Sequence, residues 1–185
     1  SKQLNDLTTR DIRDIGVGSI PDDRQGFGLV LPFSVYENMV LNSFAKNPYS
    51  PGPLYTRWDL IRKDASKIVD VFDVRCSAIN VPVSTLSGGN QQKLVVGREL
   101  SVPLQLLIAS QPTRGVDVAS ANFIQQKIVD AADEGTSVLL ISSDLDELLQ
   151  VSDRIMVLLR GQNVGTVRAD KTTREQLGRM MMGVA

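Results

Sequence analysis

The sequence contains no histidine and a single cysteine, Cys76. The absence of histidine excludes imidazole as a general base, a proton shuttle or a metal ligand. One cysteine cannot form an internal disulfide, and we assign Cys76 no functional role. Long hydrophobic runs are also missing, because the longest apolar stretches, at 104–109, 138–141 and 155–159, fall short of the roughly 18 to 20 residues that span a bilayer.

A strong charge of either sign is missing too. Basic and acidic side chains number 20 and 21, so no global basic field exists to hold a nucleic-acid backbone. The sequence therefore gives no indication of a DNA partner. Hydrophobic residues make up 42% of the chain and charged residues 22%, which is typical of a globular protein with a core.

The first half of the sequence predicts a short strand, a polar loop and a helix-rich segment. Residues 14–20 have the pattern of a strand, and the run PDDRQG at 21–26 breaks it into a loop. Ser34 and Glu37 predict a capping box at the start of a helix that continues to about residue 41. Prolines at 48, 51 and 53 predict a loop, and apolar residues at helical spacing predict an amphipathic helix over 61–72.

The second half alternates strands with helices. Apolar runs at 104–110, 136–142 and 154–159 predict strands, and their length and composition fit parallel strands buried on both faces. A helix over 119–134, ended by Gly135, joins the first two. A hairpin into 164–167 and a last helix capped by Thr172 and Glu175 follow. This β-α-β pattern predicts an α/β fold.

The run Leu86-Ser87-Gly88-Gly89-Asn90-Gln91 begins a further predicted helix. Two glycines let a backbone approach an anion, and the first amides of a helix carry partial positive charge, so the run suits a phosphate. Taken alone, Ser-Gly-Gly is more often a loop with a helix cap. The phosphate interpretation gains from its context, because a buried strand ending at Ser110 and a glycine-containing turn ending at Asp117 follow it.

These motifs, in this order and at this spacing, resemble the ATP-binding cassette (ABC) ATPases over about residues 11–182. The resemblance rests on the segments PDDRQGFGLVLPFSVYENMVL, STLSGGNQQK, SQPTRGVDV and LLISSDLDELLQVSDRIMVL. More narrowly, they are similar to the second ATP-binding half of the tandem subunits that drive simple-sugar and nucleoside importers.

The resemblance implies a partial P-loop NTPase (RecA-like) parallel sheet with an ABC-type helical subdomain. Residues 1–29 would belong to the RecA-like core, with Asp22 at the Q-loop position, and residues 30–83 would form the helical subdomain. Residues 84–168 would hold the signature helix, the Walker B strand, the D-loop and the switch, and residues 169–185 a C-terminal helix.

Two departures from the family pattern predict that this chain's own nucleotide site is degenerate. A P-loop needs G-x-x-x-x-G-K-[ST], yet none of the 14 glycines is followed by lysine, so we expect an N-terminally truncated chain. At the Walker B position Ser110 is a weak Mg²⁺ ligand, and Gln111 cannot serve as a general base, although a glutamine can orient a water. The switch position, often a histidine, aligns with Ser143.

The signature is therefore expected to act in trans. In ABC dimers each nucleotide lies between one domain's P-loop and the opposite domain's signature helix. The resemblance thus implies that a partner's site, which binds ATP and Mg²⁺, is completed by Ser87, Gly88, Gly89, Asn90 and Gln91. Asp117, at the D-loop position, is expected either at the dimer seam or as the N-cap of the next helix, and the two roles are compatible.

The resemblance also implies partners and a location. The partners are a second ATP-binding domain, in the same full-length chain, transmembrane permease subunits and, indirectly, a substrate-binding protein, at the cytoplasmic face of the cell membrane. The chain alone is expected to be inactive. Two other classes stay open: a non-catalytic regulatory or scaffold domain, and the head of a DNA-maintenance ATPase, which the lack of sustained heptads disfavours.

Overall fold

The computed structural model of the protein describes residues 4–52 and 55–183. The fold divides into two compact units, of which the first ends at Leu139 and the second begins at Leu140. Within the described ranges, no helix is both long and apolar enough to cross a lipid bilayer.

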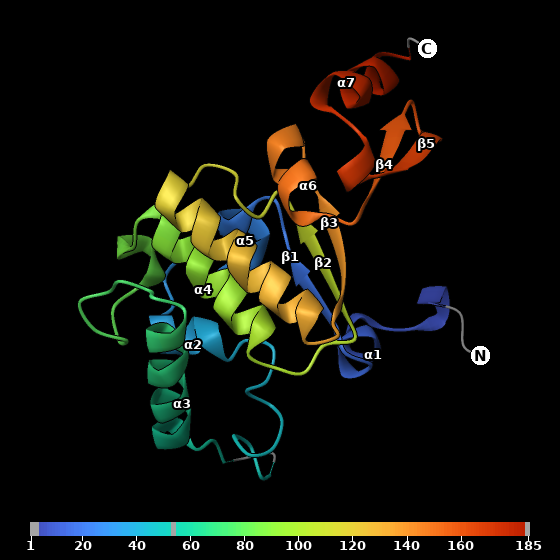
Figure 1. Ribbon diagram of the computed structural model, residues 1–185. Helices are drawn as coiled ribbons and strands as arrows, with labels where there is room; N and C mark the ends of the chain where they lie inside the picture. Colours follow the sequence, from blue (N-terminus) through green and yellow to red (C-terminus); the bar gives the residue numbers. More distant parts are fainter. Residues whose placement is uncertain (1–3, 53–54, 184–185) are drawn as a thin grey trace. The chain divides into compact units, whose positions relative to one another are not determined.

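A three-stranded parallel sheet forms the centre of the fold (Figure 1). Its strands lie in the order β1 (Val17–Ile20), β2 (Leu106–Ser110) and β3 (Ser137–Ile141). The register of β1 and β2 places Gly18 beside Leu107 and Ile20 beside Ala109. All four of these residues are buried, so one face of the sheet is closed. The strands predicted at 104–110 and 136–142 are thereby confirmed.

Two long helices close that face (Figure 1). Helix α4 (Gly88–Leu100) packs on β1, and helix α5 (Val118–Asp133) packs on α4. Helix α4 is buried all round from Gln91 to Glu99. The expectation that β3 is buried on both faces is wrong, since Leu139 and Ile141 are each 47% exposed. They lie on the last strand of the sheet.

The helix-rich segment follows its predicted pattern. Ser34 and Glu37 form the capping box of helix α2 (Val35–Met39), with the Ser34 amide donating to the Glu37 carboxylate at 2.8 Å. The amphipathic helix is α3 (Trp58–Val71), which buries Ile61, Ala65 and Val69. The proline-rich stretch is a loop as far as it is described, and Pro53 lies outside the described residues. Helix α3 packs on both α2 and α4.

The N-terminal segment differs from its prediction in two places. The strand expected over 14–20 begins only at Val17, because Thr9–Asp14 forms helix α1 with its own capping box from Thr8 and Asp11. The loop predicted at 21–26 contains a single π-helical turn, Arg24–Gly28. Asp23 caps this turn by accepting hydrogen bonds from the amides of Gln25 and Gly26 at 3.1 and 2.9 Å.

The second unit contains helix α6 (Leu145–Val151), a hairpin and helix α7 (Arg174–Met182). The hairpin of β4 (Arg154–Leu159) and β5 (Gln162–Arg168) is confirmed. The expectation that β4 is a parallel strand is wrong, because the short turn at Arg160 and Gly161 permits only antiparallel pairing. Helix α7 is capped by Thr173 and Gln176 rather than by Thr172 and Glu175. Ile155, Val157 and Leu177 form the core of this unit.

Candidate phosphate-binding site

The first turn of α4 is left without a side-chain cap. Ser87 occupies the N-cap position, yet its hydroxyl makes no hydrogen bond to the helix amides. The Ser87 Oγ instead accepts from Nδ2 of Asn90 at 2.9 Å, and Oδ1 of Asn90 accepts from the backbone N–H of Arg75 at 2.8 Å. Asn90 therefore holds the Ser87 side chain away from the capping position. The first amides of the helix remain available to an anion.

Both signature glycines lie under side chains from distant segments. A Cβ at Gly88 would lie 2.7 Å from Nη2 of Arg24. A Cβ at Gly89 would lie 2.6 Å from the Ser120 Oγ and 3.0 Å from the Asp117 Oδ2. Real Cβ atoms do not approach other atoms so closely, so a larger residue would force these side chains to move. The two glycines thus serve tight packing as well as an open path to the backbone.

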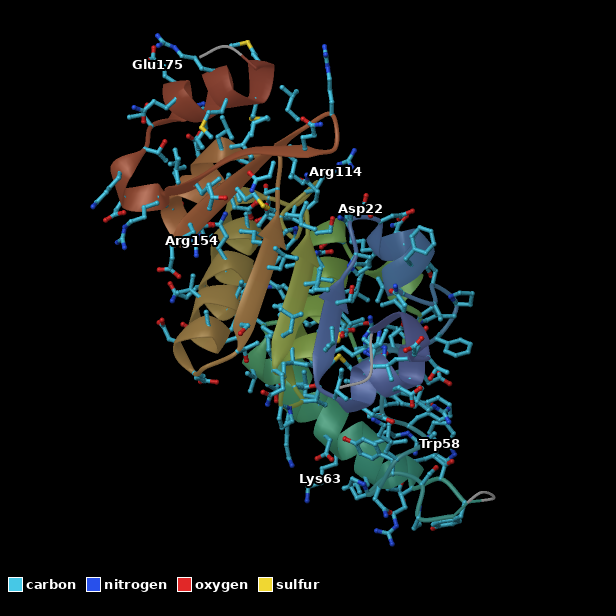
Figure 2. The ribbon with its side chains drawn as sticks, turned by 90° about the vertical axis from the view of Figure 1, so that its right-hand side faces the viewer. Asp22, Trp58, Lys63, Arg114, Arg154 and Glu175 are labelled. Atoms are coloured by element: carbon cyan, nitrogen blue, oxygen red, sulfur yellow. The ribbon has the colours of Figure 1, made fainter. Side chains whose placement is uncertain are left out.

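The guanidinium of Arg24 connects the segment after β1 to the turn after β2. Its Nη1 donates to the carbonyl of Arg114 at 3.0 Å, and its Nη2 donates to the carbonyl of Gly115 at 3.4 Å. Figure 2 shows Asp22 and Arg114 beside the same end of the sheet, while Trp58 and Lys63 lie toward the other end. Asp22 itself is exposed in the bend that follows β1.

Two buried glutamines of α4 fix the surrounding loops. The Gln91 amide donates to the carbonyls of Val83 and Leu86 at 3.1 and 3.3 Å and accepts from the Gln25 amide at 3.0 Å. The Gln92 amide donates to the carbonyl of Pro112 at 2.8 Å. Both side chains are at most 3% exposed, so Gln91 holds the loop before α4 and does not face solvent.

Asp117 is the N-cap of α5, which confirms that part of its prediction. Its Oδ1 accepts from the amide of Ser120 at 2.9 Å and its Oδ2 from the hydroxyl of Ser120 at 2.8 Å. The hydrogen bond from the Ser120 amide is the main reason that the pKa of Asp117 lies below its ordinary value. The carboxylate is therefore ionised at neutral pH, at the edge of the signature.

The residues at the end of β2, which were expected at the Walker B position, do not fit a magnesium ion. Ser110 is the last residue of β2, and Gln111 follows it with a φ of 48°, in the left-handed region that costs about 1–3 kcal/mol for a residue other than glycine. Hydroxyl and amide oxygens are poorer ligands for a hard cation than carboxylates. The described residues contain no cluster of three or more His, Cys, Asp or Glu side chains that could hold a metal.

The structure brings part of the predicted set together. Ser87, Gly88, Gly89 and Asp117 come together at the start of α4, whereas Ser143 belongs to the second unit, in the exposed turn before α6. Sequence reasoning misses Arg24 because the pattern predicts only a polar loop there, and the partners of Arg24 lie 90 and 91 residues away. It also misses Gln92. The one signal in the sequence is a polar residue within a predicted helix, and only the structure shows that this helix is buried.

Solved structures with this fold are ATP-binding cassettes. A dimeric, post-hydrolysis ATP-binding cassette bound to ADP and Pi superposes with a TM-score of 0.74 over 91% of this chain and 70% of that chain, at 23% identity. The ADP conformation of another ABC transporter cassette gives a TM-score of 0.69 over 98% of this chain and 70% of that chain, at 18% identity. The fold is therefore that of an ABC cassette.

No protein-family model matches the sequence. The chain is 42% identical over 182 residues to the guanosine import ATP-binding protein NupO of Bacillus subtilis, covering 98% of this chain and 36% of that protein. It is 42% identical over 183 residues to the nucleoside import ATP-binding protein NupA of Lactococcus lactis, covering 99% and 36%. It is 36% identical over 186 residues to the ribose import ATP-binding protein RbsA 3 of Rhizobium etli, covering 100% and 35%.

The chain belongs to the ABC family of ATP-binding proteins, and the relatives named above are import proteins for guanosine, nucleosides and ribose. It spans about a third of the length of these curated relatives.

Proposed function

We propose that this chain is part of the ATP-binding subunit of an importer for simple sugars or nucleosides, and that it supplies its signature to a partner's ATP site. The single observation that carries the proposal is the uncapped first turn of α4. Ser87 does not cap the helix because Asn90 holds its hydroxyl, and Gly88 and Gly89 leave the backbone open. An anion is the natural ligand of such a helix start.

The donation in trans follows from what the chain's own site lacks. Ser110 and Gln111 stand where a metal ligand and a general base would be needed. The P-loop, ATP and Mg²⁺ are therefore assigned to a second ATP-binding domain. That domain holds the nucleotide, while Ser87 and the amides of this chain contact its terminal phosphate. In this account ATP hydrolysis occurs only in the assembled transporter.

The remaining assignments concern the transporter as a whole. The helix-rich segment over 30–83, with α2 and α3, would be the surface that meets the permease at the cytoplasmic face of the membrane. Asp117 would also lie at the seam between the two ATP-binding domains, where its lowered pKa keeps it charged and able to accept a hydrogen bond. The substrate would be delivered to the permease by a separate binding protein.

The test is Gly88→Asp in the full-length subunit assembled with its permease. The substitution puts a carboxylate beside the uncapped amides and Nη2 of Arg24, at the place proposed for the phosphate. The loss of anion-stabilising donors typically lowers a rate by ~10² to 10³, so we expect a fall of about a hundredfold or more in ATP hydrolysis.

The matched control is Gly178→Asp on α7, where a Cβ would meet no atom within 4 Å. This variant is expected to hydrolyse ATP at the wild-type rate. Calorimetry on the isolated chain is expected to detect negligible ATP binding. A regulatory or scaffold domain with its own nucleotide site would instead bind ATP tightly. Unchanged hydrolysis by the assembled Gly88→Asp transporter would refute the proposal.

A further inference from the structure

Arg24 carries a positive charge for which the described residues provide no counter-ion. Among the described residues its terminal nitrogens bond only to the backbone carbonyls of Arg114 and Gly115, and none of the described ion pairs includes it. Its Nε is buried and has no hydrogen-bond partner among the described residues. Each terminal nitrogen also carries a second N–H that no described residue accepts. The two terminal nitrogens therefore have N–H groups to spare, whereas the buried Nε is closed to a ligand.

The position of this charge matters because a carboxylate stands on the other side of the signature. The Asp117 Oδ2 would lie 3.0 Å from a Cβ on Gly89, and the Arg24 Nη2 would lie 2.7 Å from a Cβ on Gly88. The lowered pKa of Asp117 keeps that carboxylate ionised. An anion at the start of α4 thus meets the negative charge of Asp117 beside Gly89. The positive charge of Arg24 beside Gly88 offsets that repulsion.

We infer that Arg24 is a cationic member of the phosphate site and donates to the terminal phosphate of the partner's nucleoside triphosphate. The inference rests on the proposed function, and it adds a ligand to the signature serine and glycines. Because the guanidinium is tethered by two carbonyls of the turn before Asp117, its position is fixed before the phosphate arrives. A planar guanidinium with unused N–H groups suits the oxygens of a phosphate.

The competing role for Arg24 is purely positional. In that role its two hydrogen bonds would only hold the turn at Arg114 and Gly115 against α4, and its charge would be incidental. The two roles differ in what a lysine can replace. Lys at this position keeps the charge and loses the fork that spans both carbonyls, whereas Gln keeps neutral N–H donors and loses the charge.

The experiment compares Arg24→Gln and Arg24→Lys in the full-length subunit assembled with its permease. Kinetics of Mg-ATP hydrolysis give KM and kcat, and inhibition by Mg-ADP gives a binding constant for a nucleotide that lacks the terminal phosphate. Loss of a charge-assisted contact predicts a rise of about tenfold to a hundredfold in the KM for ATP with Arg24→Gln. Inhibition by ADP should not change, and Arg24→Lys should recover most of the loss.

Arg10→Gln is the matched control. Arg10 is an exposed arginine on α1 and precedes the amino end of β1, whereas Arg24 follows the carboxyl end of β1. It should behave as wild type. Wild-type kinetics for Arg24→Gln would overturn the inference while Gly88→Asp still tested the proposed function separately. Equal losses for Arg24→Gln and Arg24→Lys, or an equal weakening of ADP inhibition, would overturn it in favour of the positional role.

Discussion

Replacing Glu99 by alanine should be among the most destabilising single changes in this chain. Glu99 is the counter-ion of Arg98, with Nε of Arg98 3.0 Å from its Oε1, and the two side chains are only 2% and 6% exposed. Its carboxylate also accepts from Nδ2 of Asn42 at 2.8 Å and from the backbone N–H of Ser19 at 3.3 Å. This residue therefore joins α4 to β1 and to the segment after α2.

The magnitude follows from what the substitution leaves behind. Burial already lowers the pKa of Arg98, and the charge of Glu99 opposes that effect. Without Glu99 the guanidinium keeps its bond to the carbonyl of Gly28 at 2.7 Å but loses its buried counter-ion. Removing one partner of a buried pair typically destabilises a protein by about 3–5 kcal/mol. With a urea m-value of about 2 kcal/mol/M, the midpoint of unfolding should fall by about 2 M.

Urea denaturation followed by the fluorescence of Trp58, the single tryptophan, measures this shift in the first unit. The control is Glu134→Ala, because Glu134 is exposed at the end of α5 and should change stability by less than about 0.5 kcal/mol. The double variant Arg98→Met with Glu99→Leu should lose much less than the two single variants added together, because it removes both charges. A loss below about 1 kcal/mol for Glu99→Ala, or strict additivity, would contradict the reasoning.

Two further predictions concern pH and the second unit. Hydrogen bonds lower the pKa values of four carboxyl groups. The Thr8 hydroxyl donates to Asp11 and the Ser34 hydroxyl to Glu37, while the Lys93 ammonium donates to Asp73 and the Ser120 amide to Asp117. Because these groups are stronger acids in the folded state, the unfolded chain binds more protons. The stabilisation of the fold by these carboxylates is therefore present above about pH 4.5 and is lost as the pH falls below about 4. A urea midpoint at pH 3.5 equal to that at pH 7 would contradict this. Leu177→Ala removes a fully buried side chain and should destabilise the hairpin and α7 by about 2–5 kcal/mol. Amide hydrogen exchange in β4 and β5 should therefore become faster, and unchanged exchange in these strands would refute the prediction.

Local chemistry accounts for much of what could be predicted. The capping box of Ser34 and Glu37, the end of α5 at Gly135 and the β4–β5 hairpin depend on residues close together in the sequence, and all were predicted correctly. Helix α1 was missed because its capping residues, Thr8 and Asp11, stand next to an apolar pattern that also fits a strand.

The order and spacing of the motifs identified the family, because a nucleotide-binding fold needs particular residues in a fixed succession along the chain. The chemistry around the signature was decided only by the tertiary structure. Arg24 reaches carbonyls 90 and 91 residues away, and Gln92 reaches the carbonyl of Pro112. Such contacts depend on how the strands align side by side, and nothing local in the sequence encodes that alignment. By itself the sequence therefore predicted which residues would bind a phosphate, and the fold decided which charges stand beside them.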